Sequence, residues 1–270
     1  MANTLTPERA SALGVAHLPS GRQEIVSDYS RILIEEAGTV RTLLFVRDDG
    51  TTAIESMMDL ARPHELLVPY TQAMFSSYLF LPRQERVLIV GLGGGSMVRF
   101  LEHHEPELRI DVVEIDPAVI DAARDYFGTH ASPRAQIFEQ DGFDFLRSTT
   151  TVYDVVYMDA FLKPSEDTDD SGTPLRLKTQ AFLRSLQERV HPDGLIVFNV
   201  NELSDLALLR DVFPQTYVFR LKAPGAVAVG TLSHRRLPIA DLRSAARDLD
   251  VRFQANFSFV DMVERLEPKS

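Results

Sequence analysis

The sequence predicts an α/β fold in which a parallel sheet follows a small antiparallel β-domain. From residue 83 onward, short apolar runs alternate with helical patterns, and this alternation calls for a parallel sheet with right-handed crossovers. Between residues 21 and 60, β-prone runs are separated by turn residues, as in an antiparallel sheet. The 270 residues are 44% hydrophobic and 25% charged, which suits one large globular domain with an appendage.

The N-terminal part is expected to contain three kinds of segment. Residues 1–20 lack periodicity and are expected to form a loose arm. Three runs in the β-domain of residues 21–60 read as strands, and the Asp49-Gly50 turn follows them. These runs are residues 23–29, 31–36 and 40–47. Apolar residues at helical spacing over residues 63–81 then predict a helix, so that residues 61–82 link the β-domain to the larger domain.

The larger domain, residues 83–270, is expected to hold seven strands. Five of them alternate with helices and cover residues 87–90, 110–115, 136–139, 152–158 and 195–200. The helices are predicted at residues 96–103, 117–126, 142–147 and 179–190. The last two strands, 216–221 and 226–231, read as a hairpin around Lys-Ala-Pro-Gly, and a helix over 238–248 closes the chain.

Composition excludes several classes of function. The absence of Cys excludes disulfides, thiolate nucleophiles and Cys-based zinc sites, and it fits the cytoplasm. No apolar run approaches the ~20 residues of a membrane span, and the N-terminus lacks a signal-peptide pattern, so a cytoplasmic location is expected. A net charge of -11 disfavours nucleic acid and favours cationic partners. The seven His residues show no ligand spacing, so no metal site is predicted.

A glycine-rich turn follows the first strand of the larger domain. Gly91, Gly93, Gly94 and Gly95 lie between an apolar strand and the start of a helix. Glycines in this position let the backbone turn sharply and let a ligand approach main-chain N–H groups. The glycines alone do not choose the ligand, because dinucleotide-binding turns follow similar logic.

Acidic residues at the ends of the following strands indicate a nucleoside. Glu114 comes 23 residues after Gly91, where an acid can accept both ribose hydroxyls, and only one of Glu114 and Asp116 is expected to face the ribose. Asp141, followed by Gly142, ends the next strand and suits either an adenine amino group or a helix N-cap, or both. Asp159 ends the fourth parallel strand and is the predicted catalytic residue, which holds an amine or takes a proton.

Asp154 begins the strand that Asp159 ends, and it is expected to be a turn residue without a role in catalysis.

These motifs resemble the spermidine synthases, or polyamine aminopropyltransferases, within the Rossmann-like class I S-adenosylmethionine-dependent methyltransferase fold. The likeness runs from about Gln23 to Val200. It implies a seven-stranded sheet, S-adenosylmethionine or its decarboxylated form as cofactor, and a possible homodimer. It also implies that Glu114 binds the ribose, that Asp141 and Gly142 bind the adenine, and that Gln23 contacts the nucleoside from the β-domain.

The departures from the family pattern fall on the aminopropyl chemistry. The family's Gly-Gly-Gly-Asp-Gly-Gly aligns its Asp with Gly94, and its Asp-x-x-Asp-Pro loop keeps Asp159 but has Leu162 and Lys163 next. The Tyr-His-Glu of its connecting helix becomes Tyr70-Thr71-Gln72, so Tyr70 and Gln72 are the expected substrate-binding residues.

Loss of the Asp at Gly94 removes a charge that would repel a donor carboxylate and leaves an exposed N–H there. The same Gly-Leu-Gly-Gly-Gly-Ser turn is similar to that of eukaryotic protein methyltransferases on this scaffold. The favoured hypothesis is therefore methyl transfer to a small-molecule or peptide amine.

Two alternatives stay open. The first is aminopropyl transfer, since the acidic segment 165–172 offers substitute carboxylates for a polyamine and the net charge suits a cationic acceptor. The second is a nucleoside-binding protein without catalysis.

Overall fold

The computed structural model describes residues 14–18, 21–222 and 224–268. Most of the predicted arm, residues 1–13 and 19–20, lies outside these ranges. Residues 14–18 do not form the loose arm that was predicted. Val15 and Leu18 are buried in the core, and the N–H of Ala16 donates to the carbonyl oxygen of Asp125.

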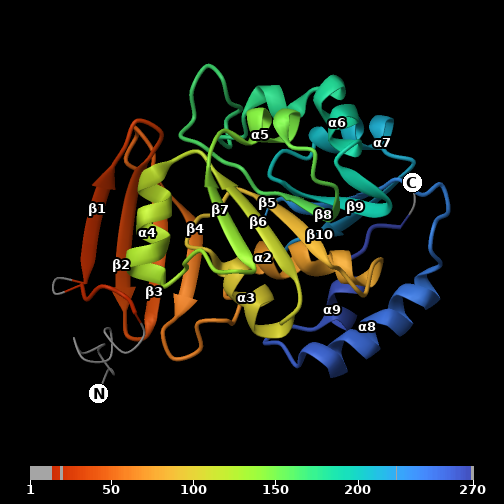
Figure 1. The fold of residues 1–270 in the computed structure, drawn as a ribbon, viewed down its shortest axis with the longest axis horizontal. Helices are drawn as coiled ribbons and strands as arrows, with labels where there is room; N and C mark the ends of the chain where they lie inside the picture. The colour runs from red at the N-terminus through yellow and green to blue at the C-terminus, as the bar shows by residue number, and fades with distance from the viewer. Residues whose placement is uncertain (1–13, 19–20, 223, 269–270) are drawn as a thin grey trace.

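The N-terminal sheet is antiparallel and has four strands in the order β1-β2-β3-β4 (Figure 1). They are β1 (Arg22–Val26), β2 (Arg31–Ala37), β3 (Val40–Val46) and β4 (Thr52–Asp59). Sequence analysis predicted three of them and missed β4. Its pattern is inverted, because apolar Ile54 is 51% exposed while polar Ser56 is buried, so no alternation of apolar residues marks the strand.

The linking helix is shorter than predicted. It comprises α2 (Pro69–Met74) and the 3₁₀ helix η1 (Phe75–Leu79), and the prediction that it begins at residue 63 is wrong. Pro69 takes the first helical position, where a missing N–H costs nothing. The preceding segment is held by side chains instead, since the Leu66 N–H donates to Asn256 and the Leu66 carbonyl accepts from Gln72 and Asn256.

The main sheet has seven strands in the order β10-β11-β9-β8-β5-β6-β7. They are β5 (Arg86–Val90), β6 (Arg109–Glu114), β7 (Ala135–Glu139), β8 (Tyr153–Met158), β9 (Val190–Val200), β10 (Gln215–Arg220) and β11 (Ala226–Thr231). Strand β11 runs antiparallel to β9 and β10, while β5 to β9 are parallel. The carboxyl ends of these five strands therefore meet at one edge of the sheet.

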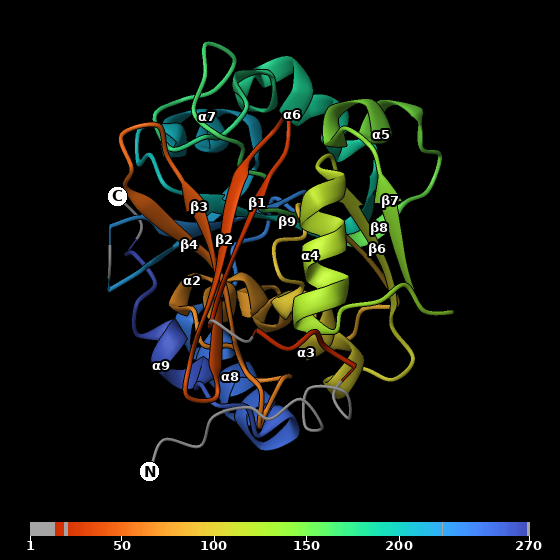
Figure 2. The ribbon, with the colours of Figure 1, turned by 90° about the vertical axis from the view of Figure 1, so that its left-hand side faces the viewer.

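Helices cover both faces of this sheet (Figures 1 and 2). They are α3 (Ser96–His104), α4 (Pro117–Phe127), α5 (Gly142–Ser148), η2 (Leu175–Lys178), α6 (Gln180–Gln187), α7 (Asp205–Val212), α8 (Ile239–Phe253) and α9 (Phe259–Val263). Sequence analysis missed α7 and α9 and ended the C-terminal helix at residue 248 instead of Phe253. None of the helices in the described part of the chain is both long and apolar enough to cross a bilayer.

The N-terminal sheet docks on α4, beside which it stands in both views (Figures 1 and 2). Arg41 of β3 is fully buried, pairs with Glu36 and donates to the carbonyl oxygen of Tyr126 at 2.6 Å. At the other end of α4, the hydroxyls of Ser27 and Ser30 donate to Asp116. These contacts place β4 against the turn between β5 and α3.

Candidate active site

The glycine turn between β5 and α3 lies at the carboxyl edge of the sheet. Gly91, Gly93 and Gly95 have φ angles of +100°, +52° and +75°, which favour glycine. A Cβ on Gly91 would overlap the carbonyl oxygen of Asp159. The turn and the end of β8 therefore touch, and a side chain at residue 91 would separate them.

Glu114, the last residue of β6, lines the cavity above this turn. Its carboxylate accepts from the N–H groups of Leu92 and Asp116, both at 2.9 Å, so its orientation is held from two sides. Burial raises its pKa to about 7. Asp116 is instead the N-cap of α4 and accepts from Ala118. Of this pair of acids, Glu114 is the one that faces the cavity.

Asp141 and Gly142 also line the cavity, at the start of α5. One Asp141 oxygen accepts from the N–H groups of Phe143 and Asp144, and the other pairs with Arg176. The N-cap role is thus present. A Cβ on Gly142 would lie 2.6 Å from Val90 Cγ1, so only glycine fits between α5 and β5.

Asp159 follows β8 and lies beside the glycine turn. The amide of Asn199 donates to its Oδ1 at 2.9 Å, and the Tyr70 hydroxyl lies near it. Burial raises the pKa of Asp159 to about 6, and the Asn199 and Tyr70 side chains limit the rise. Asp154, at the other end of the same strand, accepts from the N–H groups of Glu85 and Arg86 and has a structural role.

The main cavity has a volume of about 580 Å³ and runs along this edge from Asp141, after β7, to Asp159, after β8. Besides the predicted residues, Phe45, Glu55, Phe143 and Arg176 line it. Sequence reasoning missed these four. Glu55 comes from the strand that was not predicted, and Arg176 belongs to η2, which ends the long segment after β8 and was not predicted either. Arg176 lies over the Phe143 ring, 5.3 Å from its centroid.

A second cavity of about 390 Å³ continues past the glycine turn, under β4 and α2. It shares Glu55, Gly91, Leu92, Gly93 and Asp159 with the first cavity. Its other walls include Tyr70 and the first turn of α3. The Tyr70 hydroxyl donates to the carbonyl oxygen of Glu55 at 3.2 Å, so α2 and β4 are joined at this wall.

Three of the predicted site residues do not line either cavity. Gln23 is exposed on β1 and donates to the carbonyl oxygen of Glu24, and Gln72 donates to that of Leu66 at 2.7 Å. Gly94 is buried, and its N–H, which was expected to be exposed, donates to Ser56 Oγ at 2.8 Å. A Cβ on Gly94 would lie 3.0 Å from both Ser56 Cβ and the Phe127 ring.

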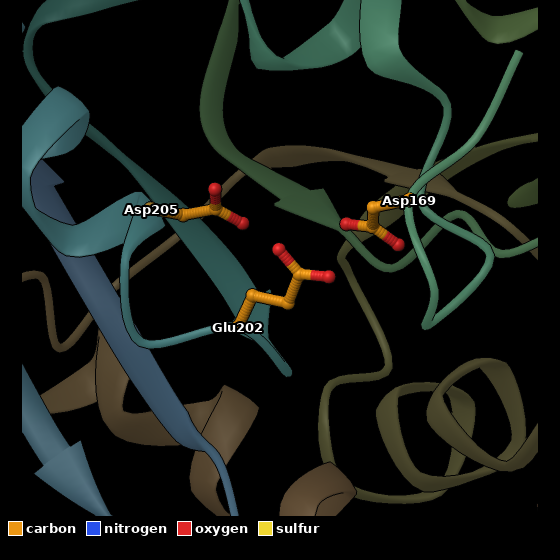
Figure 3. Close-up of side chains that lie close together, drawn as sticks. All are labelled: Asp169, Glu202 and Asp205. Carbon is orange, nitrogen blue, oxygen red and sulfur yellow. The ribbon is translucent and has the colours of Figure 1, made fainter.

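The acidic loop after β8 does not offer its central carboxylate to the cavities. Asp169 converges with Glu202 and Asp205 (Figure 3), and these oxygens are close enough to hold a metal ion. The Lys178 ammonium lies among them instead, at 2.5, 3.3 and 2.9 Å from Asp169, Glu202 and Asp205. This cluster joins the loop to the segment after β9 and to α7, so Asp169 is not free to serve as a substitute carboxylate for a polyamine.

The strand order, the glycine turn after β5 and the acid ending β6 define a class I methyltransferase fold with a nucleoside-type cavity. Residues 69–208 match the model of the spermine/spermidine synthase domain. The chain therefore belongs to the spermine/spermidine synthase family, as its motifs implied.

The similar proteins fall into two groups of transferases. A polyamine aminopropyltransferase of Vibrio vulnificus is 29% identical over 72% of this chain and 65% of its own length. The human eEF1A lysine and N-terminal methyltransferase is 32% identical over 59% of this chain, which spans only 24% of that protein.

The similar solved structures also include a methyltransferase-like protein and a spermidine synthase. Human methyltransferase-like protein 13 in complex with SAH superposes with a TM-score of 0.64 and 27% identity, over 71% of this chain and 95% of that one. A spermidine synthase in complex with the transition state analogue AdoDATO has a TM-score of 0.65 over 91% of this chain and 85% of that one. Its identity of 21% supports the fold alone.

Proposed function

We propose that this protein transfers a methyl group from S-adenosylmethionine to an amine. The observation that carries the proposal is the second cavity, which combines the first turn of α3 with the carboxyl groups of Glu55 and Asp159. The N–H groups of a helix's first turn lack intrahelical partners and attract an anion, while carboxyl oxygens accept hydrogen bonds from an ammonium. Such a cavity suits the zwitterionic amino-acid end of the intact donor.

The nucleoside half of the donor fits the main cavity. Glu114 is held by two backbone N–H groups and has lone pairs left for the two ribose hydroxyls. The adenine would lie toward Asp141 and Gly142, against the Phe143 ring. Both Asp141 oxygens already have protein partners, so this carboxylate shapes the adenine site more than it supplies a free acceptor.

The proposed chemistry is an in-line displacement. The donor supplies a sulfonium-bound methyl group: the N–C bond forms as the S–C bond breaks, the electron pair stays on sulfur, and the amine loses a proton. Asp159 lies where the two cavities meet, and a pKa of about 6 leaves it largely ionised at neutral pH. It can therefore orient the acceptor amine and take its proton.

Aminopropyl transfer from the decarboxylated donor is the second candidate. Glu55 favours it, because Glu55 places a second carboxyl group near Asp159, and two acids suit a cationic polyamine. The polyamine aminopropyltransferases among the similar proteins also support this candidate.

Calorimetry with both donors decides between these reactions, together with transfer from labelled donors to polyamines, amino acids and basic peptides. Methyl transfer predicts that the intact donor binds at least as tightly as the decarboxylated one. A preference of about tenfold or more for the decarboxylated donor, worth ~1.4 kcal/mol, would instead favour polyamine synthesis. Tight nucleoside binding without transfer to any acceptor would support a non-catalytic binding protein.

We also propose that the protein acts in the cytoplasm and forms a homodimer. Light scattering of the purified chain measures its oligomeric state.

A further inference from the structure

We propose that Glu55 selects between donors through its electrostatic interaction with the donor's tail, which is the amino-acid or aminopropyl group attached to sulfur. When ionised, Glu55 favours a tail that ends in an ammonium alone, and when neutral it accepts a tail that also carries a carboxylate. This inference rests on the proposed function, since it assumes a nucleoside donor in the main cavity.

Glu55 lies where a donor in the main cavity would extend into the second cavity. It lies on β4 and lines both cavities, together with residues of the glycine turn and Asp159. A Cβ on Gly93 would lie 3.7 Å from the carbonyl oxygen of Glu55, so the strand contacts the turn directly. A donor with its ribose at Glu114 must pass Glu55 to place its tail in the second cavity.

The carboxyl group of Glu55 is available to a ligand. Among the described residues it forms neither a hydrogen bond nor a close ion pair, unlike the other cavity acids Glu114, Asp141 and Asp159. The half-buried position makes an unpartnered charge costly. An ammonium group in the second cavity would remove that cost.

Glu55 also supplies an acidic group near the glycine turn, where the family has an Asp and this chain has Gly94. A side chain at residue 94 would point at Ser56 and Phe127. The neighbour of Ser56 on the same strand is Glu55, which lines both cavities beside the glycine turn. The charge that sequence comparison counts as missing is supplied by the N-terminal sheet.

The groups around Glu55 make its charge depend on pH. Asp159 from the end of β8 and Glu114 from the end of β6 disfavour ionisation, Arg47 after β3 favours it, and the Tyr70 hydroxyl from α2 faces its backbone. Burial is the largest cause, and together these groups raise the pKa of Glu55 to about 8. Glu55 is therefore mostly neutral at pH 6.5 and mostly ionised at pH 9.

Three stable thioether ligands test this inference on the full chain. They are 5′-methylthioadenosine, which has no tail, S-adenosylhomocysteine, which has an ammonium and a carboxylate, and decarboxylated S-adenosylhomocysteine, which has the ammonium alone. Dissociation constants are measured by calorimetry at pH 6.5 and pH 9 for the wild type, Glu55→Gln and the control Glu107→Gln. Glu107 is exposed before β6, at the opposite edge of the sheet.

In the wild type and in Glu107→Gln, we expect the preference for the decarboxylated ligand to rise at least about fivefold from pH 6.5 to pH 9. In Glu55→Gln the same change should stay below about twofold. Titration of the ligand amine is common to all three proteins, so it does not affect the comparison.

Two negative results are distinguishable. If 5′-methylthioadenosine binds but the pH response of Glu55→Gln equals that of the wild type, the role of Glu55 is wrong and the donor site stands. If 5′-methylthioadenosine does not bind the wild type at all, the proposed function fails first. The pH response of the wild type alone gives a further check, because a constant preference overturns the inference even if Glu55→Gln does not fold.

Discussion

Asp159 shows how the catalytic proposal depends on one charged group. Replacing it in Asp159→Asn keeps the shape and an oxygen for Asn199, but it removes the charge that orients the amine. We expect turnover to fall by ~10²–10⁴, the usual span of general acid–base contributions, with nearly unchanged affinity for S-adenosylhomocysteine. Labelled methyl transfer and calorimetry measure the two effects.

The pH profile gives a second readout of Asp159. Because its pKa is raised to about 6, wild-type turnover should decline as pH falls through 6 and the carboxylate takes up a proton. The residual activity of Asp159→Asn should lack this limb. The control Asp248→Asn, on the exposed face of α8, should keep wild-type turnover and profile. A purely structural Asp159 would give lost thermal stability with normal turnover per folded molecule.

Glu114 is the residue through which the ribose is recognised. Glu114→Ala would leave the Leu92 and Asp116 N–H groups both unpaired, whereas Glu114→Gln keeps an oxygen for one of them and is the milder substitution. We expect it to weaken 5′-methylthioadenosine binding by roughly 2 kcal/mol, within the range for hydrogen bonds to a charged group. Glu139→Gln, at the exposed end of the neighbouring strand, should change nothing. An unchanged affinity in Glu114→Gln would mean that the ribose lies elsewhere.

At the scale of elements, the turn between β5 and α3 is packed from both sides. Restoring the family's acid in Gly94→Asp places a Cβ only 3.0 Å from Ser56 Cβ and from the Phe127 ring. Overpacking of this kind costs about 1–3 kcal/mol, so thermal unfolding should occur at lower temperature. We expect donor preference to stay unchanged, because the new side chain begins against Ser56 and the Phe127 ring.

The matched variant for this turn is Gly94→Ala, which adds the same Cβ without charge. Equal losses of stability in the two variants would assign the effect to packing. If Gly94→Asp alone gained a preference for the decarboxylated donor, the described packing of Ser56 against the turn would be contradicted.

At the scale of the whole molecule, the free energy of unfolding depends on pH through three carboxyl groups that line the cavities. The pKa values of Glu55, Glu114 and Asp159 are raised to about 8, 7 and 6, so the folded chain binds these protons more tightly than the unfolded chain. Their stabilising contribution is complete below about pH 4 and is lost as pH rises through 6 to 8. The empty protein should therefore lose this part of its stability on the way to alkaline pH.

Glu55→Gln isolates one of these contributions. Because glutamine does not ionise, the unfolding temperature of the variant should rise relative to that of the wild type by roughly 5–10 °C between pH 6 and pH 9. This corresponds to about 2–3 kcal/mol, since pH 6 lies two units below the pKa of Glu55, at ~1.4 kcal/mol per unit. Thermal scans at both pH values measure the difference, and acid effects shared by the two proteins cancel. A difference that stays constant with pH would show that Glu55 is already ionised at pH 6.

The sequence by itself determined the local features of this protein. Alternating apolar runs are enough to place the main strands, because each strand buries both faces and its pattern lies within a few residues. The glycine turn and the strand-end acids Glu114, Asp141 and Asp159 follow in the same way, since parallel strands bring their carboxyl ends to one edge.

Only the tertiary structure decided how the two sheets meet, and this meeting shapes the site. Strand β4 has an inverted pattern, so nothing local marked it or the carboxyl group of Glu55. The docking of Ser56 on Gly94, of Arg176 on Asp141 and of Lys178 among three acids joins residues far apart in the chain. Such contacts arise from packing between elements, and packing depends on the position of every element at once.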